Sequence, residues 1–406
     1  MKSPRALALP GTDPHSFAVA EASEPIPKEC TVRVDGNRLT LITEGPQLLV
    51  TLLGLIDGAR SSLRLLYYIY TVDKSGDAVR DALLRAIERG VTVSLLIDGF
   101  GSNRTPPTYF AALHEAGAKF CRFNPAYGRR YLLRNHQKLA LADEQTALIG
   151  GFNVEDSYFG TREEGAWRDI GLIVEGPAAA RLAPYYDALI GWALHKGARL
   201  KSLRAVVRHF SEHEGPLQWQ FGGPMQLKSP WAHATARDLA KARDLEMIAA
   251  YFAPIPSMLR RIARVARRGR VRIITASKSD NHATIDAARS TYWRLLRRKV
   301  EIFEYEPTKL HSKLLVMDDV VHVGSSNFDV RSLYLNMEMM LRVRDPRFAM
   351  MMRGYFEHEI GDSTAITPAL HRRRATLLER VRWWFGFFLV SSLDYTVTRR
   401  LVRRER

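Results

Sequence analysis

Residues 136–153 read HQKLALADEQTALIGGFN, and residues 311–327 read HSKLLVMDDVVHVGSSN. In both stretches a Lys stands two positions after a His, and an Asp stands seven positions after it. The residues that follow the His are mostly apolar and predict a strand, on which His and Lys share one face. A glycine-containing turn then returns the chain, so that the closing Asn approaches the same place. A lone His-x-Lys is usually a solvated surface pair, but two copies with one spacing indicate a site.

A His, a Lys and an Asn that face one point form a pocket for a phosphate group. Two copies supply two imidazoles, one to attack phosphorus and one to handle the proton of the leaving group. The Lys and Asn side chains would stabilise the phosphoryl oxygens, and we expect the two Asp to brace the motif turns. The candidate site residues are His136, Lys138, Asp143 and Asn153 in the first copy and His311, Lys313, Asp318 and Asn327 in the second.

The elements before the two motifs follow one order. The first series predicts strands at 37–44, 64–70, 91–97 and 118–123 and helices at 46–58, 77–89 and 108–115. The second predicts strands at 245–252, 271–275 and 300–305 and helices at 257–268 and 283–298. Gly90 and Gly269 are 179 positions apart, and His136 and His311 are 175 apart, which indicates an internal duplication.

The predicted fold is therefore α/β, with two pseudo-symmetric lobes whose motifs meet face to face. Each lobe would be a mixed, parallel-rich β-sheet flanked by helices, and an amphipathic tail would follow. The predicted segments are a loose leader (1–36), a first lobe (37–195), a basic linker (196–240), a second lobe (241–360) and a basic aromatic tail (361–406).

The net charge limits the classes of partner, and the cysteine content indicates the redox compartment. The formal net charge is +17, which favours polyanions, either nucleic acid or an anionic membrane. The only two cysteines, Cys30 and Cys121, are too few for a disulfide framework and indicate a reducing compartment. No stretch reaches the roughly 18 uninterrupted apolar residues of a spanning helix.

The tail combines aromatic and basic residues. Residues 383–390 read WWFGFFLV, and residues 371–406 hold ten Arg against three acids. Such a run is too short to span a bilayer but suits a helix lying at the membrane surface. The alternative is a helix docked on the protein's own core.

The paired motif resembles the HKD signature of the phospholipase D superfamily, over residues 37 to 345. The GGFN turn of the first copy, where the superfamily usually has GSxN, resembles the bacterial cardiolipin synthase branch. The resemblance implies a covalent phosphohistidine, with His136 as nucleophile and His311 as acid and base. It also implies a downstream acid for each motif, which orients the imidazole. The matching acids are Asp169 and Glu338, which lie 33 and 27 residues after the histidines of their own repeats.

The resemblance implies a phosphatidyltransferase that makes cardiolipin from phosphatidylglycerol, or from phosphatidylglycerol and a second phospholipid. No metal or cofactor is expected, because the lysines supply positive charge. The expected partners are anionic phospholipids (phosphatidylglycerol and cardiolipin) and a membrane surface, with no nucleic acid. The expected location is peripheral or monotopic, on the cytoplasmic face of the cell membrane. A phospholipid hydrolase, a nuclease and a non-catalytic binding module are the alternatives, and the oligomeric state stays open.

Overall fold

The computed structural model describes residues 30–124, 132–195, 197–225 and 228–393. Most of the predicted leader and the last thirteen residues of the tail lie outside these ranges. The described end of the leader forms strand β1, Cys30–Val34, which pairs with β2 of the first lobe. The first lobe therefore begins before residue 37.

The first lobe is built on an eight-stranded sheet in the order β1-β2-β8-β7-β6-β3-β4-β5. Strands β3, β4 and β5 are parallel, and their apolar runs are almost fully buried, as in a sheet covered on both faces. The other pairs are antiparallel. The strands after β1 are β2 (Asn37–Ile42), β3 (Ser62–Tyr67), β4 (Thr92–Asp98), β5 (Lys119–Phe123), β6 (Leu139–Ala142), β7 (Thr146–Gly150) and β8 (Gly171–Glu175).

The second lobe repeats this arrangement in the order β18-β13-β12-β10-β14-β15-β17-β9. Strands β10, β12 and β13 are parallel and correspond to β3, β4 and β5. The strands are β9 (Leu217–Gly222), β10 (Leu245–Ala249), β12 (Val271–Ala276), β13 (Glu301–Tyr305), β14 (Lys313–Met317), β15 (Val320–Gly324), β17 (Glu338–Arg344) and β18 (Ser363–Ala365), with β11 (Phe252–Ala253) paired to β16 (Phe328–Asp329). The matching orders confirm two pseudo-symmetric α/β lobes.

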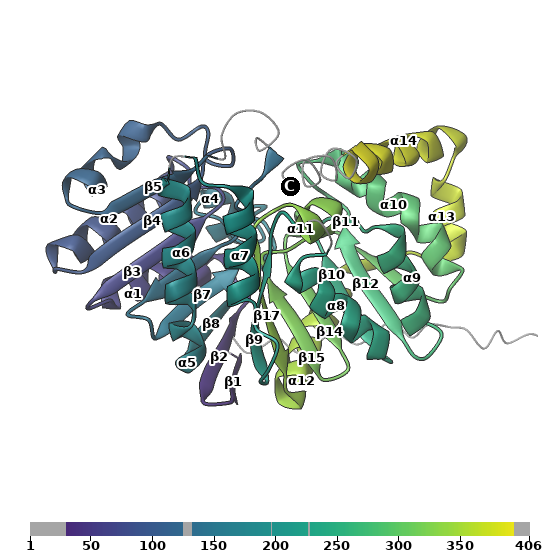
Figure 1. The fold of residues 1–406 in the computed structure, drawn as a ribbon. Helices are drawn as coiled ribbons and strands as arrows, with labels where there is room; N and C mark the ends of the chain where they lie inside the picture. The colour runs from purple at the N-terminus through teal and green to yellow at the C-terminus, as the bar shows by residue number, and fades with distance from the viewer. Residues whose placement is uncertain (1–29, 125–131, 196, 226–227, 394–406) are drawn as a thin grey trace, which may run out of the picture.

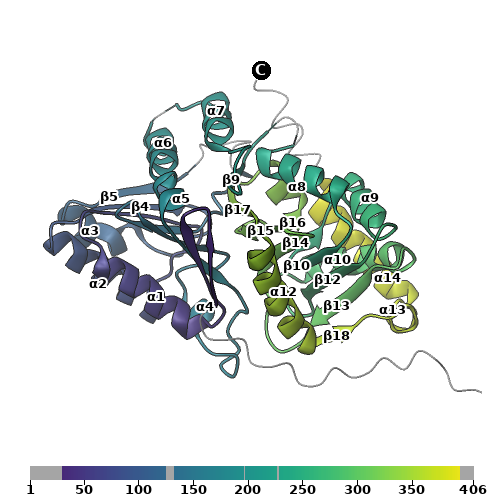
Figure 2. The ribbon, with the colours of Figure 1, turned by 90° about the horizontal axis from the view of Figure 1, so that it is seen from below.

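Helices cover both sheets (Figures 1 and 2). One apolar cluster joins the first sheet to its outer helices, and a second cluster joins the second sheet to its own helices. A third cluster contains residues of both sheets together with α6, α7 and α12. The two lobes thus share a core. The helices are α1 (Gly45–Gly58), α2 (Lys74–Glu88), α3 (Ala111–Glu115), α4 (Asp156–Phe159), α5 (Pro177–Ala180), α6 (Leu182–Leu194), α7 (Leu200–Phe210), α8 (Pro230–Lys241), α9 (Pro256–Val265), α10 (His282–Leu296), α11 (Val330–Tyr334), α12 (Pro346–Gly361), α13 (Pro368–Arg374) and α14 (Leu377–Phe387).

The segment predicted as a linker, 196–240, contributes to the second lobe. Strand β9 pairs antiparallel with β17 and forms one edge of the second sheet. Helix α8 packs its buried residues, among them Trp231 and Leu239, into the apolar cluster of that lobe. The second lobe therefore begins before residue 241, because its edge strand lies ahead of β10 in the sequence.

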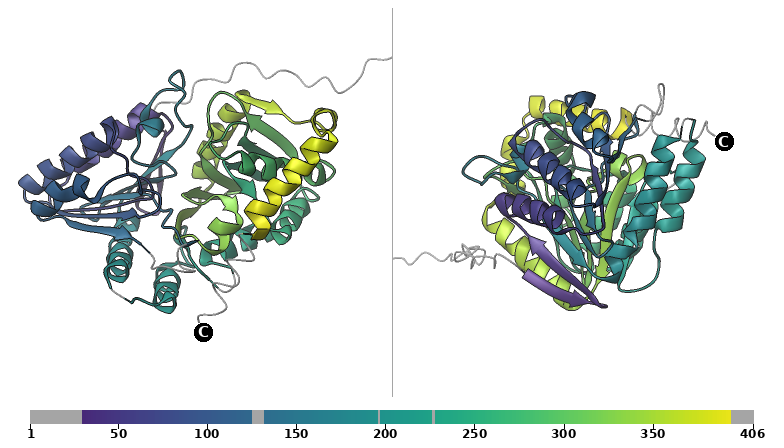
Figure 3. Two further views of the ribbon diagram at one scale, coloured as in Figure 1. Left: turned by 90° about the horizontal axis from the view of Figure 1, so that it is seen from above. Right: turned by 90° about the vertical axis from the view of Figure 1, so that its left-hand side faces the viewer.

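The described part of the predicted tail begins with β18, which pairs with β13 at the edge of the second sheet, so the second lobe extends past residue 360. Helices α13 and α14 follow on the surface of that lobe. Helix α14 lies across α10, as the view from above shows (Figure 3). Trp383 and Gly386 are buried, and Gly386 sits so close to Asp286 that an added Cβ would come within 2.7 Å of that side chain. One face of α14 is thus docked on the protein's own core, as the alternative interpretation of the tail expects.

A buried ion pair connects the lobes close to the motifs. Arg168, after the first motif, places its guanidinium 2.6 Å from the carboxylate of Glu359 on α12. It also donates to the carbonyl oxygen of Thr43 and pairs with Glu44. The side chains of Arg168 and Glu359 are 7% and 0% exposed. If one of the two charges were removed, water could therefore not solvate the other.

Arg168→Met should lower the thermal midpoint by several degrees, since it leaves the Glu359 carboxylate buried without its cation, at a cost of about 3 kcal/mol. The double variant Arg168→Met/Glu359→Met should recover much of the loss. Arg38→Met is the matched control: its pair with Glu175 is 51% and 30% exposed, so its loss should cost less than about 1 kcal/mol. Scanning calorimetry of the four proteins measures this, and equal midpoints for the two single variants would contradict it.

Candidate active site

Both motif histidines lie at the carboxyl ends of parallel strands. Strand β6 runs antiparallel to β3, with Leu139 opposite Leu66, so His136 lies just beyond the end of β3. In the second lobe Lys313 lies opposite Ala249, the last residue of β10, and places His311 in the same way. This edge of an α/β sheet is where ligands generally bind.

Two short backbone bridges hold the motifs together across the lobe boundary. The N–H of His136 donates to the carbonyl of Met337 (2.9 Å), and the N–H of Met337 donates to the carbonyl of Arg134 (2.8 Å). The symmetric bridge has the N–H of His311 donating to the carbonyl of Arg168 (2.7 Å). Each histidine is therefore fixed by the segment that carries the acid of the other lobe.

The acids and histidines are paired across the same boundary. His311 Nδ1 lies 2.6 Å from Asp169 Oδ2, and His136 Nδ1 lies 3.2 Å from Glu338 Oε2. Asp169 and Glu338 are both fully buried. The structure thus gives each imidazole the acid of the other repeat, rather than the acid that follows it in sequence. In each pair the carboxylate holds Nδ1 and leaves Nε2 for chemistry.

The difference between the GGFN and GSSN turns reflects how each acid is held. A Cβ at Gly151 would lie 2.5 Å from a carboxylate oxygen of Asp169, so the short acid occupies this space. The corresponding residue of the second turn, Ser325, donates its hydroxyl to Glu338 Oε2 at 2.6 Å. The glycine of the first turn therefore makes room for the acid that orients His311.

The lysines of the motifs are buried beside their histidines. Lys138 and Lys313 are each 1% exposed, and each ammonium donates to the carbonyl oxygen of the histidine two positions before it. Burial lowers the pKa of Lys138 to about 7 and that of Lys313 to about 8, although Glu338 and Asp169 oppose the shift. An anion entering the site would favour their charged forms.

The two asparagines occupy corresponding positions but have different surroundings. Asn153 accepts from the N–H of Ile69 (3.0 Å) and donates to the hydroxyl of Tyr158 (3.0 Å). The side-chain oxygen of Asn327 is buried and has no hydrogen-bond partner among the described residues. In the described structure both polar groups of the Asn153 side chain therefore bond to residues of its own lobe.

Asp143 and Asp318 lie at the other ends of β6 and β14 from the histidines. The carboxylate of Asp143 accepts the N–H groups of Arg60, Ser61 and Ser62, and that of Asp318 accepts the N–H groups of Arg243 and Asp244. Both adopt positive φ, 52° and 50°, at the start of their turns. These contacts match a bracing role, although the HKD pattern groups both residues with the catalytic ones. The second turn is one residue shorter, as its sequence predicts.

Aromatic side chains that the sequence reasoning missed surround the imidazoles. The Tyr68 ring centre lies 5.0 Å from that of His136, and the Lys138 ammonium lies 5.3 Å from the Tyr68 ring. Tyr158 and Trp167 stack on each other and meet the His311 ring edge-on at 5.2 and 5.3 Å. They come from separate elements, and no sequence spacing links them to the motifs.

Asp98 was also missed, although its position at the carboxyl end of β4 is a usable signal. Its buried carboxylate accepts the N–H groups of Asn135, Phe100 and Gly101 at 2.7 to 2.9 Å. Burial raises its pKa to about 6, partly offset by these bonds. Asp98 therefore anchors the segment that leads into His136.

Burial also sets the charge of the histidines. It lowers the pKa of His136, helped by Lys138 and opposed by Glu338. Burial and the two lysines hold the pKa of His311 well below its usual range. Both imidazoles are thus neutral near pH 7, and a neutral imidazole is a nucleophile or base. Within the described ranges no group of three or more His, Cys, Asp or Glu side chains is placed to hold a metal ion.

The chain matches known proteins over most of its length. The family model described as "Cardiolipin synthase, PLD-like domain" matches residues 52–187 and 236–360. Cardiolipin synthase 1 of Bacillus anthracis is 30% identical over 357 residues, which cover 84% of this chain and 70% of the relative. The major cardiolipin synthase ClsA of Bacillus subtilis (strain 168) is 30% identical over 342 residues, with 81% and 70% covered.

Among solved structures, phosphatidylserine synthase from Haemophilus influenzae Rd KW20 superposes with a TM-score of 0.64 at 15% identity and covers 91% of this chain and 96% of its own. Polyphosphate kinase from Porphyromonas gingivalis superposes with a TM-score of 0.56 at 13% identity, over 82% and 49% of the two chains. These similarities show the shared fold.

The activity should fall at alkaline pH because of the buried lysines. A lowered lysine pKa means that the ammonium is charged below that value and neutral above it. The kcat/KM for a short-chain phospholipid should therefore decline as pH rises from about 7 to about 8. A bound phosphodiester favours the ammonium forms, so kcat should decline at higher pH than kcat/KM. A kcat/KM that stays level to pH 9 would exclude both lysines as the charge that binds phosphate.

Proposed function

Since this chain belongs to the cardiolipin synthase family of phospholipase D-like phosphatidyltransferases, we propose that it makes cardiolipin from phosphatidylglycerol through a covalent phosphohistidine. The observation that carries the mechanism is the crossed pairing of two buried histidines with two buried acids, beside two buried lysines. These groups form one site from both lobes.

In the first step Nε2 of His136 attacks the phosphorus of phosphatidylglycerol. The bond from phosphorus to the headgroup oxygen breaks, a phosphatidyl group is left on His136, and glycerol departs with a proton from His311. The incoming phosphodiester anion raises the pKa of His311, which enables that imidazole to carry the proton. Lys138 and Lys313 stabilise the charge on the phosphoryl oxygens.

In the second step a hydroxyl of another phosphatidylglycerol gives its proton to His311 and attacks the phosphorus. The bond from phosphorus to His136 breaks, which releases cardiolipin and restores the free imidazole. One phosphodiester replaces another, so added glycerol should drive the reaction backwards. Glu338 and Asp169 stabilise the imidazolium forms through Nδ1.

Exposure supports His136 as the nucleophile. Its side chain is 12% exposed and that of His311 is 5% exposed. The contact of His311 with its acid is also the shorter one, 2.6 Å against 3.2 Å, and rings of Tyr158 and Trp167 enclose it. A nucleophile must reach phosphorus, whereas a proton carrier needs only hydrogen-bond reach.

We propose further that α14 rests on the membrane. Leu377, Val381 and Trp384 lie about one turn apart on its outer face and are 57% to 81% exposed. The opposite face, with Trp383, is docked on α10. An apolar and aromatic face of this kind suits the interface between water and lipid. Among the described residues no helix is long and apolar enough to cross a membrane.

The docked end of α14 points toward the site. A Cβ at Gly386 would lie 3.1 Å from the carbonyl oxygen of Ala283, near the start of α10. Asp280, just ahead of α10, accepts from the hydroxyl of Tyr251, whose ring centre lies 6.5 Å from that of His311. A membrane under α14 would thus bring lipid hydroxyls to the second step in preference to bulk water.

Incubation with phosphatidylglycerol vesicles should yield cardiolipin and glycerol in equal amounts, read by mass spectrometry, and excess glycerol should suppress cardiolipin. His136→Ala and His311→Ala should each lose on the order of 10³-fold or more, and the double variant little beyond that, because the two imidazoles act as a unit. Phosphatidic acid as the main product would establish a hydrolase instead. A single variant that kept a tenth of the activity would rule out the shared site.

Val381→Asp/Trp384→Asp should weaken binding to phosphatidylglycerol vesicles by at least about 10-fold, because it removes interfacial contacts and adds negative charge. The matched control is Val50→Asp/Met350→Asp, which alters residues 69% and 68% exposed on α1 and α12. Turnover of soluble short-chain phosphatidylglycerol should be the same in all three proteins. Equal vesicle binding by the two variants would show that α14 is not the contact.

A further inference from the structure

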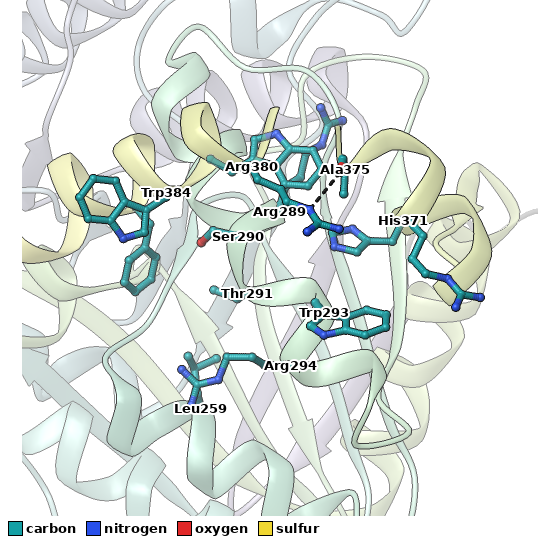
Figure 4. A pocket seen from close by; sticks show the side chains of 13 residues that line it. Leu259, Arg289, Ser290, Thr291, Trp293, Arg294, His371, Ala375, Arg380 and Trp384 are labelled. Atoms are coloured by element: carbon teal, nitrogen blue, oxygen red, sulfur yellow. Dashed lines mark hydrogen bonds between the residues drawn. The ribbon is translucent and has the colours of Figure 1, made fainter. Parts of the chain in front are cut away.

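A hollow of about 580 Å³ lies over the outer face of α10, and none of the motif residues lines it. Its walls come from α10, α13 and α14, with Leu259 of α9 at its base. Figure 4 shows Trp384 at one end and the rings of Trp293 and His371 at the other, with Arg294 between α10 and α9. The volume falls in the range that binds small ligands.

The hollow carries cationic side chains and no acidic ones. Four arginines line it, and four line the smaller hollow beside it, with Arg294 shared between the two. No Asp or Glu lines either hollow. Arg289 is neutralised by Glu304, which it contacts at 2.8 and 2.9 Å. Arg294 and Arg372 are exposed and have no hydrogen-bond or ion-pair partner among the described residues.

Several exposed arginines that line one hollow, with no acidic side chain among them, create a local positive potential that attracts anions. The guanidinium group holds phosphate through two parallel hydrogen bonds, which makes arginine the usual residue for such ligands. The position of Arg294 at the junction of the two hollows gives it access to a ligand in either. The charge pattern therefore fits a phosphate-bearing ligand.

Aromatic rings line one end of the same hollow. His371 stacks between Trp293 and Trp383, at ring distances of 6.4 and 5.4 Å. Trp383 is 4% exposed, and its indole N–H has no acceptor among the described residues. A buried donor without an acceptor is uncommon in a folded protein. Burial lowers the pKa of His371, and Arg380 lowers it further, as expected beside so many cations.

We propose that this hollow binds the phosphodiester headgroup of an anionic phospholipid in the membrane, at a site separate from the catalytic one. Trp384 belongs both to the lining of the hollow and to the exposed apolar face of α14. A lipid whose headgroup enters the hollow can therefore lay its acyl chains along that face. The combination of arginines, indoles and an adjoining apolar face selects an amphiphile over a free phosphate ion. This inference rests on the proposed function in one respect: it takes a membrane as the partner of the protein. It does not depend on the proposed reaction.

The test compares two charge-matched double variants at about 0.15 M salt. Arg294→Gln/Arg372→Gln removes two charges of the hollow, and Arg33→Gln/Arg208→Gln removes two exposed arginines of β1 and α7. Affinity for vesicles of phosphatidylglycerol in phosphatidylcholine should fall about 10-fold or more in the first variant and no more than about 3-fold in the second. Millimolar inorganic phosphate, at constant ionic strength, should leave vesicle binding of the unaltered protein unchanged.

Equal losses in the two variants would overturn the proposal, since the membrane would then respond to net charge alone. Displacement from vesicles by inorganic phosphate would also overturn it, in favour of a free-phosphate site. Turnover of soluble short-chain phosphatidylglycerol should be the same in all three proteins. The proposed reaction can fail independently of this site. If the unaltered protein formed no cardiolipin, but vesicle binding still fell only in Arg294→Gln/Arg372→Gln, the result would refute the reaction and support the hollow.

Discussion

The contact between the acid of one lobe and the histidine of the other is the constraint on which the site depends. His311 meets Asp169, and His136 meets Glu338, only when the two repeats are docked correctly. The backbone bridges beside these contacts, and the apolar cluster shared by both sheets, fix that docking. Neither lobe alone holds an oriented imidazole, so the duplication and the chemistry are inseparable.

The same docking explains how the protein keeps two ammonium groups out of water. Lys138 and Lys313 are almost fully buried, and their neighbours in the site are carbonyl oxygens, the two acids and an aromatic ring. Burial of such charges is costly, and the fold repays it through paired carboxylates and a shared core. The result is a buried site in which an arriving phosphodiester favours the charged forms of both lysines.

The second lobe adds a surface that the first lobe lacks. Helices α13 and α14 cover the outer side of α10, with one face docked and the other open. The docked face of α14 begins the contact path that leads through Asp280 and Tyr251 to His311. The open face and the arginine-lined hollow lie on the same helix pair, which this path links to the catalytic site.

The sequence by itself determined the α/β class, the duplication and the motif residues, because these depend on local periodicity and on spacing along one chain. Tertiary structure alone decided what spacing cannot encode. It paired each acid with the histidine of the other repeat, placed Tyr68 and Trp167 beside the imidazoles, and assigned β9 to the second sheet. It also buried the side chain of Trp383 and left that of the neighbouring Trp384 exposed. Each of these outcomes depends on contacts between residues far apart in sequence, which form only when the two sheets close around one core.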